Sequence, residues 1–80
     1  MWYYMTKYSF DSEKKIMGPF KTREEAWKEM EKAAINEYDI DVSENEFDTE
    51  LYVDNEAGEV TIINYFTTGK DVTEFFIFEI

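Results

Sequence analysis

The chain has 80 residues, a formal net charge of −11 at pH 7, and neither cysteine nor histidine. Without cysteine no disulfide can form, and without histidine the commonest zinc ligand and general base is missing. A chain of this length forms one small domain, so we expect residues 1–80 to make a single compact unit. Apolar packing must hold it together, and seven Phe, six Tyr and two Trp supply most of the bulk.

The first twenty residues predict two strands. Residues 2–10 alternate at period two and place four aromatic rings on one face. The polar run 11–15 predicts a turn, and Ile16-Met17 predicts a short return strand. Gly18-Pro19 ends that strand or marks it as an edge, because proline cannot donate to a strand ladder.

One helix is predicted from Thr22 onward. Thr22 and Glu25 have the spacing of a capping box, in which a threonine side chain caps the first turn and a glutamate follows three residues later. The helix is expected to end near Glu37 or Tyr38. Its apolar residues recur at helical spacing and form one core-facing stripe, which places Trp27 in the core; the stripe consists of Ala26, Trp27, Met30, Ala33, Ala34 and Tyr38.

The second half of the chain predicts a loop followed by strands. Residues 39–46 have no strand or helix period and are expected to form a loop or irregular extended segment. Residues 47–53 alternate between apolar and polar side chains, and residues 60–67 are β-branched and aromatic, which favours an interior strand. Between these strands, residues 55–58 predict a hairpin loop in which Gly58 takes the left-handed conformation.

The last predicted strand covers residues 72–80, after a turn at 68–70, and its run of Phe and Ile suggests burial on both faces. The element order is therefore β-β-α-β-β-β. Short turns between the last three strands favour an antiparallel sheet covered by one helix, which is the α+β class. An exposed edge on the last strand would invite pairing with a second copy, so a homodimer through this strand is one expectation.

The chemistry of an enzyme is missing from the chain. Ser9, Ser12 and Ser43 have no histidine to activate them, and three glycines are too few for a phosphate-binding loop. A domain of this size has little room for a cleft that would bind a sugar between paired carboxylates. We therefore expect a non-enzymatic protein with no catalytic residues and no cofactor.

One spacing matches a calcium loop in part. Five residues occupy positions 1, 3, 5, 7 and 12 of the EF-hand pattern: Asp39, Asp41, Ser43, Asn45 and Glu50. Position 6, which needs glycine for a sharp turn, is Glu44, and a strand pattern follows in place of the exiting helix. A solvated acidic loop is the preferred interpretation, so no metal site is expected, and calcium binding is kept as an alternative.

The charge of the chain is unevenly distributed. Ten carboxylates and no Lys or Arg lie between Lys32 and Lys70, whereas the first 32 residues carry seven basic and six acidic groups. Such a span either keeps the protein soluble through like-charge repulsion or forms a docking surface for a basic partner. At −11 the protein is repelled by nucleic acid and by anionic membranes, so neither is expected to bind it directly.

The docking hypothesis centres on the strand predicted at 47–53. Outward carboxylates on a strand repeat every two residues, at about 6.6–6.8 Å, a charge rhythm that a Lys- and Arg-lined groove would accept as it accepts phosphates. Tyr52 lies on the same polar face and is a candidate aromatic anchor, as is Tyr65. The predicted partner-binding residues are Glu44, Glu46, Asp48, Glu50, Tyr52, Asp54, Glu56 and Glu59.

Two resemblances accompany this pattern. Gly18-Pro19-Phe20, followed by Thr22 and Glu25-Ala26, resembles the strand-to-helix joint of the sporulation-related peptidoglycan-binding repeat. That family has a second strand-helix-strand half, whereas three strands are predicted here, so the likeness implies shared joint geometry. The size, the acidic face, the compact α+β fold and the lack of Cys and His are similar to small acidic inhibitors of phages and mobile elements, including anti-CRISPR proteins and other DNA mimics.

The class likeness implies an inhibitor whose acidic face occupies the nucleic-acid-binding groove of a basic protein such as a host-defence nuclease. A cytoplasmic location is expected, in a bacterial host if the protein is phage-encoded. No apolar run approaches the ~20 residues of a membrane span, and the first residues lack the pattern of a signal peptide. The alternative is a general interaction or regulatory module that uses an exposed sheet edge and aromatic side chains, with the acidic surface serving only solubility.

Overall fold

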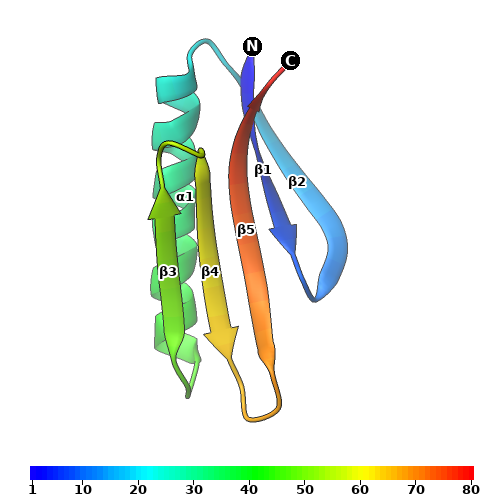
Figure 1. Cartoon of the computed structure of the whole chain (residues 1–80), viewed down its shortest axis with the longest axis vertical. Helices are drawn as coiled ribbons and strands as arrows, with labels where there is room; N and C mark the ends of the chain where they lie inside the picture. The colour runs from blue at the N-terminus through cyan, green and yellow to red at the C-terminus, as the bar shows by residue number, and fades with distance from the viewer.

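The computed structural model describes residues 1–80 and contains one helix packed on one five-stranded sheet (Figure 1). The elements follow the predicted order. They are β1 (Trp2–Tyr8), β2 (Asp11–Phe20), α1 (Arg23–Glu44), β3 (Thr49–Asp54), β4 (Glu59–Tyr65) and β5 (Lys70–Glu79).

The strands are ordered β2-β1-β5-β4-β3 across the sheet, and every neighbouring pair is antiparallel. The α+β class and the antiparallel sheet are therefore confirmed. β5 lies at the centre, and α1 connects the two edge strands β2 and β3 while covering one face (Figure 1). The opposite face, which we call the open face, carries no covering element.

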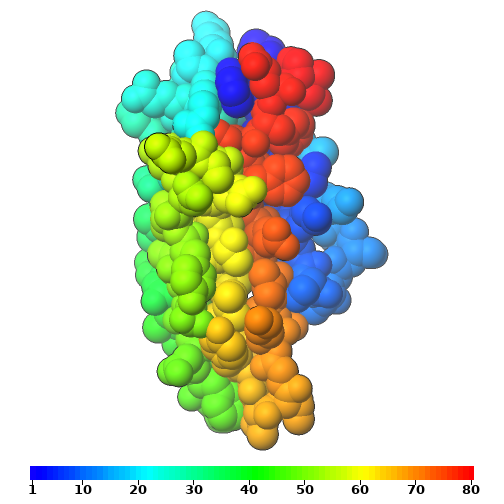
Figure 2. All heavy atoms as spheres, viewed as in Figure 1, coloured from blue at the N-terminus to red at the C-terminus, as the bar shows by residue number.

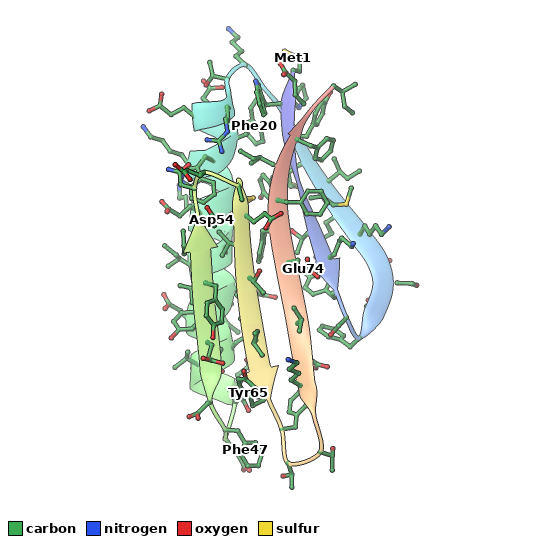
Figure 3. The ribbon with its side chains drawn as sticks, viewed as in Figure 1. Met1, Phe20, Phe47, Asp54, Tyr65 and Glu74 are labelled. Atoms are coloured by element: carbon green, nitrogen blue, oxygen red, sulfur yellow. The ribbon has the colours of Figure 1, made fainter.

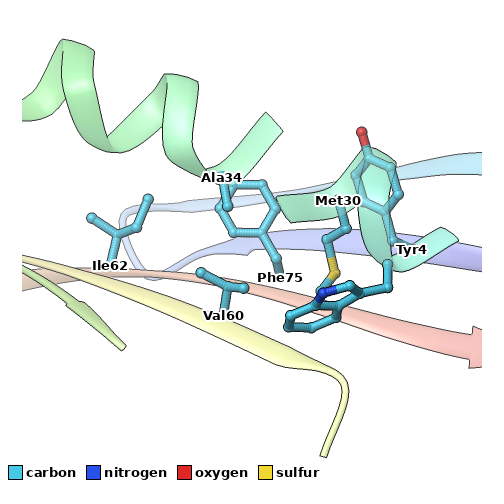
Figure 4. Packing of buried hydrophobic residues seen from close by; sticks show 7 residues of the cluster. Tyr4, Met30, Ala34, Val60, Ile62 and Phe75 are labelled. Carbon is cyan, nitrogen blue, oxygen red and sulfur yellow. The ribbon is translucent and has the colours of Figure 1, made fainter. Parts of the chain in front are cut away.

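The core lies between α1 and the middle strands of the sheet (Figure 4). Met30 and Ala34 are fully buried on the helix, and they pack with Val60 and Ile62 of β4. Phe75 of β5 completes the centre of this layer. The predicted apolar stripe is confirmed, since its remaining members pack in or against the same core: Ala26, Trp27, Ala33 and Tyr38.

The predicted start of the helix is confirmed. Thr22 is the N-cap, and its Oγ1 accepts a hydrogen bond of 3.1 Å from the Glu25 backbone N–H. The Glu25 carboxylate accepts from the backbone N–H of Lys21, one residue before the cap. Arg23 donates to the backbone carbonyls of Asn55 and Glu56, so the first helical turn is tied to the β3–β4 turn.

The end of the helix differs from the prediction. α1 continues to Glu44, with Asn45 as its C-cap, so residues 39–44 are helical and do not form the predicted loop. Ile40 and Val42 have low helix propensity, so local propensity does not predict that the helix continues through these residues. Tertiary bonds hold these turns instead: the Asn64 side chain on β4 donates to the Asp41 carboxylate at 2.8 Å.

The first hairpin is also longer than predicted. β2 starts at Asp11, and only Ser9 and Phe10 form the turn, so the polar run 11–15 is strand. Phe10 lies in the turn and is 64% exposed, but its ring still packs against that of Tyr8, with the ring centroids 5.3 Å apart. Because an edge strand has little to bury, its backbone pairs with β1 whatever the polarity of its side chains.

The remaining strands are close to the predicted ones. β3 starts at Thr49, which leaves Phe47 in the preceding loop, and Gly58 takes the predicted left-handed conformation with φ of 72°. The prediction that β5 is buried on both faces was wrong in part. Phe75 and Thr73 are buried under α1, whereas Phe76 and Phe78 on the open face are only partly buried.

The central place of β5 corrects the expectation of a homodimer through the last strand. Both edges of β5 are already paired, one with β1 and the other with β4. The free sheet edges belong to β2 and β3. The structure contains one helix, α1, and this helix is not apolar enough to cross a membrane.

Candidate functional site: an acidic strand edge

The acidic site is built on β3, the edge strand at one side of the sheet. Thr49, Leu51 and Val53 pair with Asn64, Ile62 and Val60 of β4, two of which are buried under the helix. Alternation therefore turns the intervening side chains to the open face: Glu50, Tyr52 and Asp54.

The predicted carboxylate row is extended by its neighbours. Asp48 precedes β3 in the same alternation, and Glu59 of β4 pairs directly with Asp54, so both lie on the open face. Glu56 lies in the β3–β4 turn. We call this set the acidic edge, and it follows β3 for about 20 Å, the length of six strand residues. Its members are Asp48, Glu50, Tyr52, Asp54, Glu56 and Glu59.

Two predicted residues lie outside this row. Glu44 is the last residue of α1, and Glu46 lies in the following turn, so both are at one end of β3 instead of along it. Figure 3 shows how far apart the ends are, with Phe47 below β3 and Asp54 near its top. The eight predicted residues thus form a strip along β3 and around its ends.

Two tyrosines interact with the Glu50 carboxylate. The Tyr52 hydroxyl donates to the Glu50 carboxylate at 2.7 Å. Hydrogen bonding from Tyr65 and from Tyr52 holds the pKa of Glu50 below its usual value, and the same contact raises the pKa of Tyr65 to about 12. Glu50 is therefore charged through the physiological range. The contact between Glu50 and Tyr52 has a signal in the sequence, because residues at i,i+2 on a strand point to the same face. The contact between Glu50 and Tyr65 depends on the β3–β4 register, which the sequence alone does not give.

A second polar cluster, which sequence reasoning missed, anchors the start of β3. The Thr49 hydroxyl donates to the Asn64 side-chain oxygen at 2.9 Å, and the Asn64 amide donates to Asp41. The Asn45 side-chain amide lies within 3.5 Å of both the Asn64 oxygen and the Tyr65 carbonyl. These bonds join the end of α1 to β3 and β4, so the acidic edge starts from a fixed position.

The structure does not support the EF-hand alternative. Asp39, Asp41 and Ser43 lie on α1, and a helical backbone cannot wrap them around one cation. No group of three or more acidic side chains in the structure is arranged to hold a metal ion.

A shallow hollow of about 270 Å³ lies beside the end of α1. Its lining residues are Phe10, Asp41, Glu44, Asn45, Asn64, Phe66 and Asp71.

The acidic end of α1 works against helix stability. The last turn carries no basic residue, although cations are favoured there and anions disfavoured by the helix dipole. Burial raises the pKa of Glu37, and the nearby charges of Asp41 and Glu44 raise it further, while Lys15 partly offsets them. The negative charge at this end therefore has an energetic cost.

This cost can be measured with Glu37→Gln. Because the folded pKa lies above the ordinary value of 4.5, the ionised carboxylate opposes folding once the pH exceeds the folded pKa. We expect Glu37→Gln to raise the thermal unfolding midpoint by a few degrees at pH 7, and this gain to vanish as the pH falls below the unfolded pKa, where both states are protonated. The midpoints are measured by circular dichroism at pH 7 and at a pH below the unfolded pKa. An equal increase in the unfolding midpoint under both conditions would contradict the electrostatic explanation.

The opposite side of the sheet carries charges of both signs, with Asp11 and Glu13 of β2 beside three lysines. Lys7 of β1 pairs directly with Lys14 of β2, and Lys15 is next to it on β2. Four strand spacings separate β2 from β3, which is about 19 Å across a flat sheet. The acidic edge has no Lys or Arg within its own stretch of sequence. Two cations from elsewhere in the chain lie near its ends: Arg23 bonds to the backbone of the β3–β4 turn, and the charge of Lys70 acts on Glu50.

Comparison with known proteins gives no further guide to the function of this edge. No protein-family model matches the chain, and neither the curated proteins nor the solved structures provide a match.

Proposed function

We propose that this protein is a non-enzymatic inhibitor or binding protein whose acidic edge occupies the basic, nucleic-acid-binding groove of a partner protein. A host-defence nuclease in a bacterial cytoplasm is the partner class that fits the proposal. The observation that carries it is the ordered carboxylate row on β3, in a stretch of sequence without a single cation.

The distribution of charge supports a role beyond solubility. Charges that serve only solubility work best when both signs are interspersed over the surface. Here the acidic groups are concentrated, and they include placements at the end of α1 that oppose its dipole. Self-repulsion of this kind destabilises the free fold, and a basic partner would relieve it.

The rigidity of the edge supports recognition. The Tyr52 hydroxyl bonds to the Glu50 carboxylate, and the start of β3 is anchored by the Asn45–Asn64 cluster. Groups held in place before binding lose less conformational entropy when they meet a partner. Tyr52, which is 51% exposed, offers an aromatic surface between Glu50 and Asp54.

The test compares two variants of equal charge. The first neutralises the acidic edge with Asp48→Asn, Glu50→Gln, Asp54→Asn and Glu56→Gln. The matched control neutralises four exposed carboxylates elsewhere: Glu13, Glu24, Glu29 and Glu79, each to Gln. Wild type and both variants serve as bait in nuclease-treated bacterial lysate at low and high salt, and captured DNA-binding proteins are assayed for DNA binding or cleavage.

We expect wild type and the control variant to inhibit a captured protein, and the edge variant to lose at least about tenfold in potency, which is roughly 1.4 kcal/mol. Capture should weaken steeply with salt because charge carries the contact. Unchanged potency in a folded edge variant would overturn the proposal. Capture that is insensitive to salt would favour the alternative of a general interaction module in which the acidic groups serve only solubility.

A further inference from the structure

The two free edges of the sheet are protected very differently. β2 carries Lys14, Lys15 and Pro19, and its pairing with β1 is interrupted by register shifts. Lysine, proline and bulges are the devices by which proteins prevent another strand from adding to an edge. β3 has none of them: it contains no Lys and no Pro, and its six residues pair with β4 in unbroken register.

The outward backbone groups of β3 can be assigned from its ladder. The Tyr65 N–H donates to the Asp48 carbonyl, so Asp48 and Tyr65 belong to a hydrogen-bonded pair. Such pairs alternate along an antiparallel ladder. Residues 50, 52 and 54 therefore direct their backbone groups to β4, and Thr49, Leu51 and Val53 direct theirs away from the sheet, where a further strand can pair.

An apolar flank lies on the helix side of this edge. Ile35, Tyr38 and Val42 lie on successive turns along one side of α1, the side on which Trp27 and Asn55 line a common hollow beside the β3–β4 turn. Ile35 and Val42 are 44% and 48% exposed, and Val53 of β3 is 50% exposed. The space-filling view shows side chains of α1 emerging beyond β3 along this edge (Figure 2).

We propose that β3 accepts an extended segment of the partner as a sixth strand, and that this segment alternates basic and apolar residues. This inference rests on the proposed function, because the partner is the same basic protein. Paired residues on neighbouring strands point to the same face. Residues facing Leu51 and Val53 would thus cover the apolar flank, and Lys or Arg facing Glu50 and Asp54 would meet carboxylates.

The charges of β3 decide between a second copy and a basic partner. Pairing of β3 with β3 of another copy would bring Asp48, Glu50 and Asp54 of both chains close together, and like charges on neighbouring strands destabilise a sheet. A cationic strand gains from the same carboxylates. The acidic groups thus exclude self-pairing at an edge that otherwise has no protection.

The test uses two capped synthetic peptides as long as β3 and of identical composition. One alternates Lys and Val, and the other places all Lys before all Val. We expect the alternating peptide to bind at least about tenfold more tightly in calorimetry. The backbone amide signals of Thr49, Leu51 and Val53 should shift most in NMR spectra. Equal affinities, or shifts centred on β2, would overturn the inference.

Two further reagents test the backbone pairing itself. Val53→Pro removes an outward N–H without removing a bond to β4, a position where an edge strand tolerates proline. N-methylation of the peptide backbone tests the same bonds with wild-type protein, which covers the case in which Val53→Pro does not fold. Each change is expected to weaken binding at least about tenfold, and full binding by the N-methylated peptide would exclude strand addition.

These outcomes separate the two proposals. If the alternating peptide does not bind but the edge variant still loses its captured partner, strand addition is wrong and the acidic-groove proposal stands. If the peptide binds through β3 and no captured protein is inhibited, the edge is a strand acceptor and the inhibitor function is wrong.

Discussion

Gly58→Ala is expected to lower the free energy of unfolding by about 2–5 kcal/mol. Gly58 has a φ of 72°, a left-handed conformation that costs a residue with a Cβ roughly 1–2 kcal/mol. A Cβ built there would lie within van der Waals overlap of the Ile77 side chain on β5. Overpacking of this kind costs a further ~1–3 kcal/mol, because Gly58 is itself buried.

Gly69 provides the matched control for this substitution. It lies in the β4–β5 turn without a left-handed φ, and a Cβ there would meet no atom within 4 Å. Gly69→Ala should change stability by less than ~0.5 kcal/mol. Urea unfolding of both variants measures the difference, and equal midpoints would show that the β3–β4 turn relaxes to accept the methyl group.

Met30→Ala is expected to cost about 2–5 kcal/mol, since it removes a fully buried side chain from the centre of the helix–sheet contact. Domains of this size have a total stability of roughly 4–12 kcal/mol. Because the core is thin, few neighbouring side chains are available to fill the cavity. The variant is expected to melt at a much lower temperature, or to be partly unfolded at 37 °C.

The same substitution at Met17 isolates the role of burial. Met17 is 50% exposed on the edge strand β2, and Met17→Ala should cost less than about 1 kcal/mol. The two variants lose the same atoms, so their difference reports the contribution of the core at Met30. Similar urea midpoints for both would mean that the helix–sheet layer repacks around the cavity.

The elements with the strongest local signals were predicted from the sequence. Thr22 and Glu25 define the helix start because a cap needs only residues three apart. The alternation around Leu51 fixes which side chains of β3 face outward, and Gly58 marks the turn that follows. In each case the deciding contacts are formed within a few residues of chain.

The boundaries that depend on distant partners were not predictable. The last two turns of α1 are held by a bond between Asp41 and Asn64, which are 23 residues apart in sequence. The polar residues of β2 form a strand only because β1 is beside them. Local propensity favoured a loop in both places, and tertiary pairing reversed it.

The sequence by itself determined the α+β class, the core stripe of the helix and the acidity of the span between Lys32 and Lys70, because composition and periodicity express these directly. Only the tertiary structure decided that β5 is central and that β3 is a free edge. Strand order depends on which backbones pair over long sequence distances, and this pairing places the carboxylates, the apolar flank of α1 and the free backbone groups of β3 at one edge of the sheet.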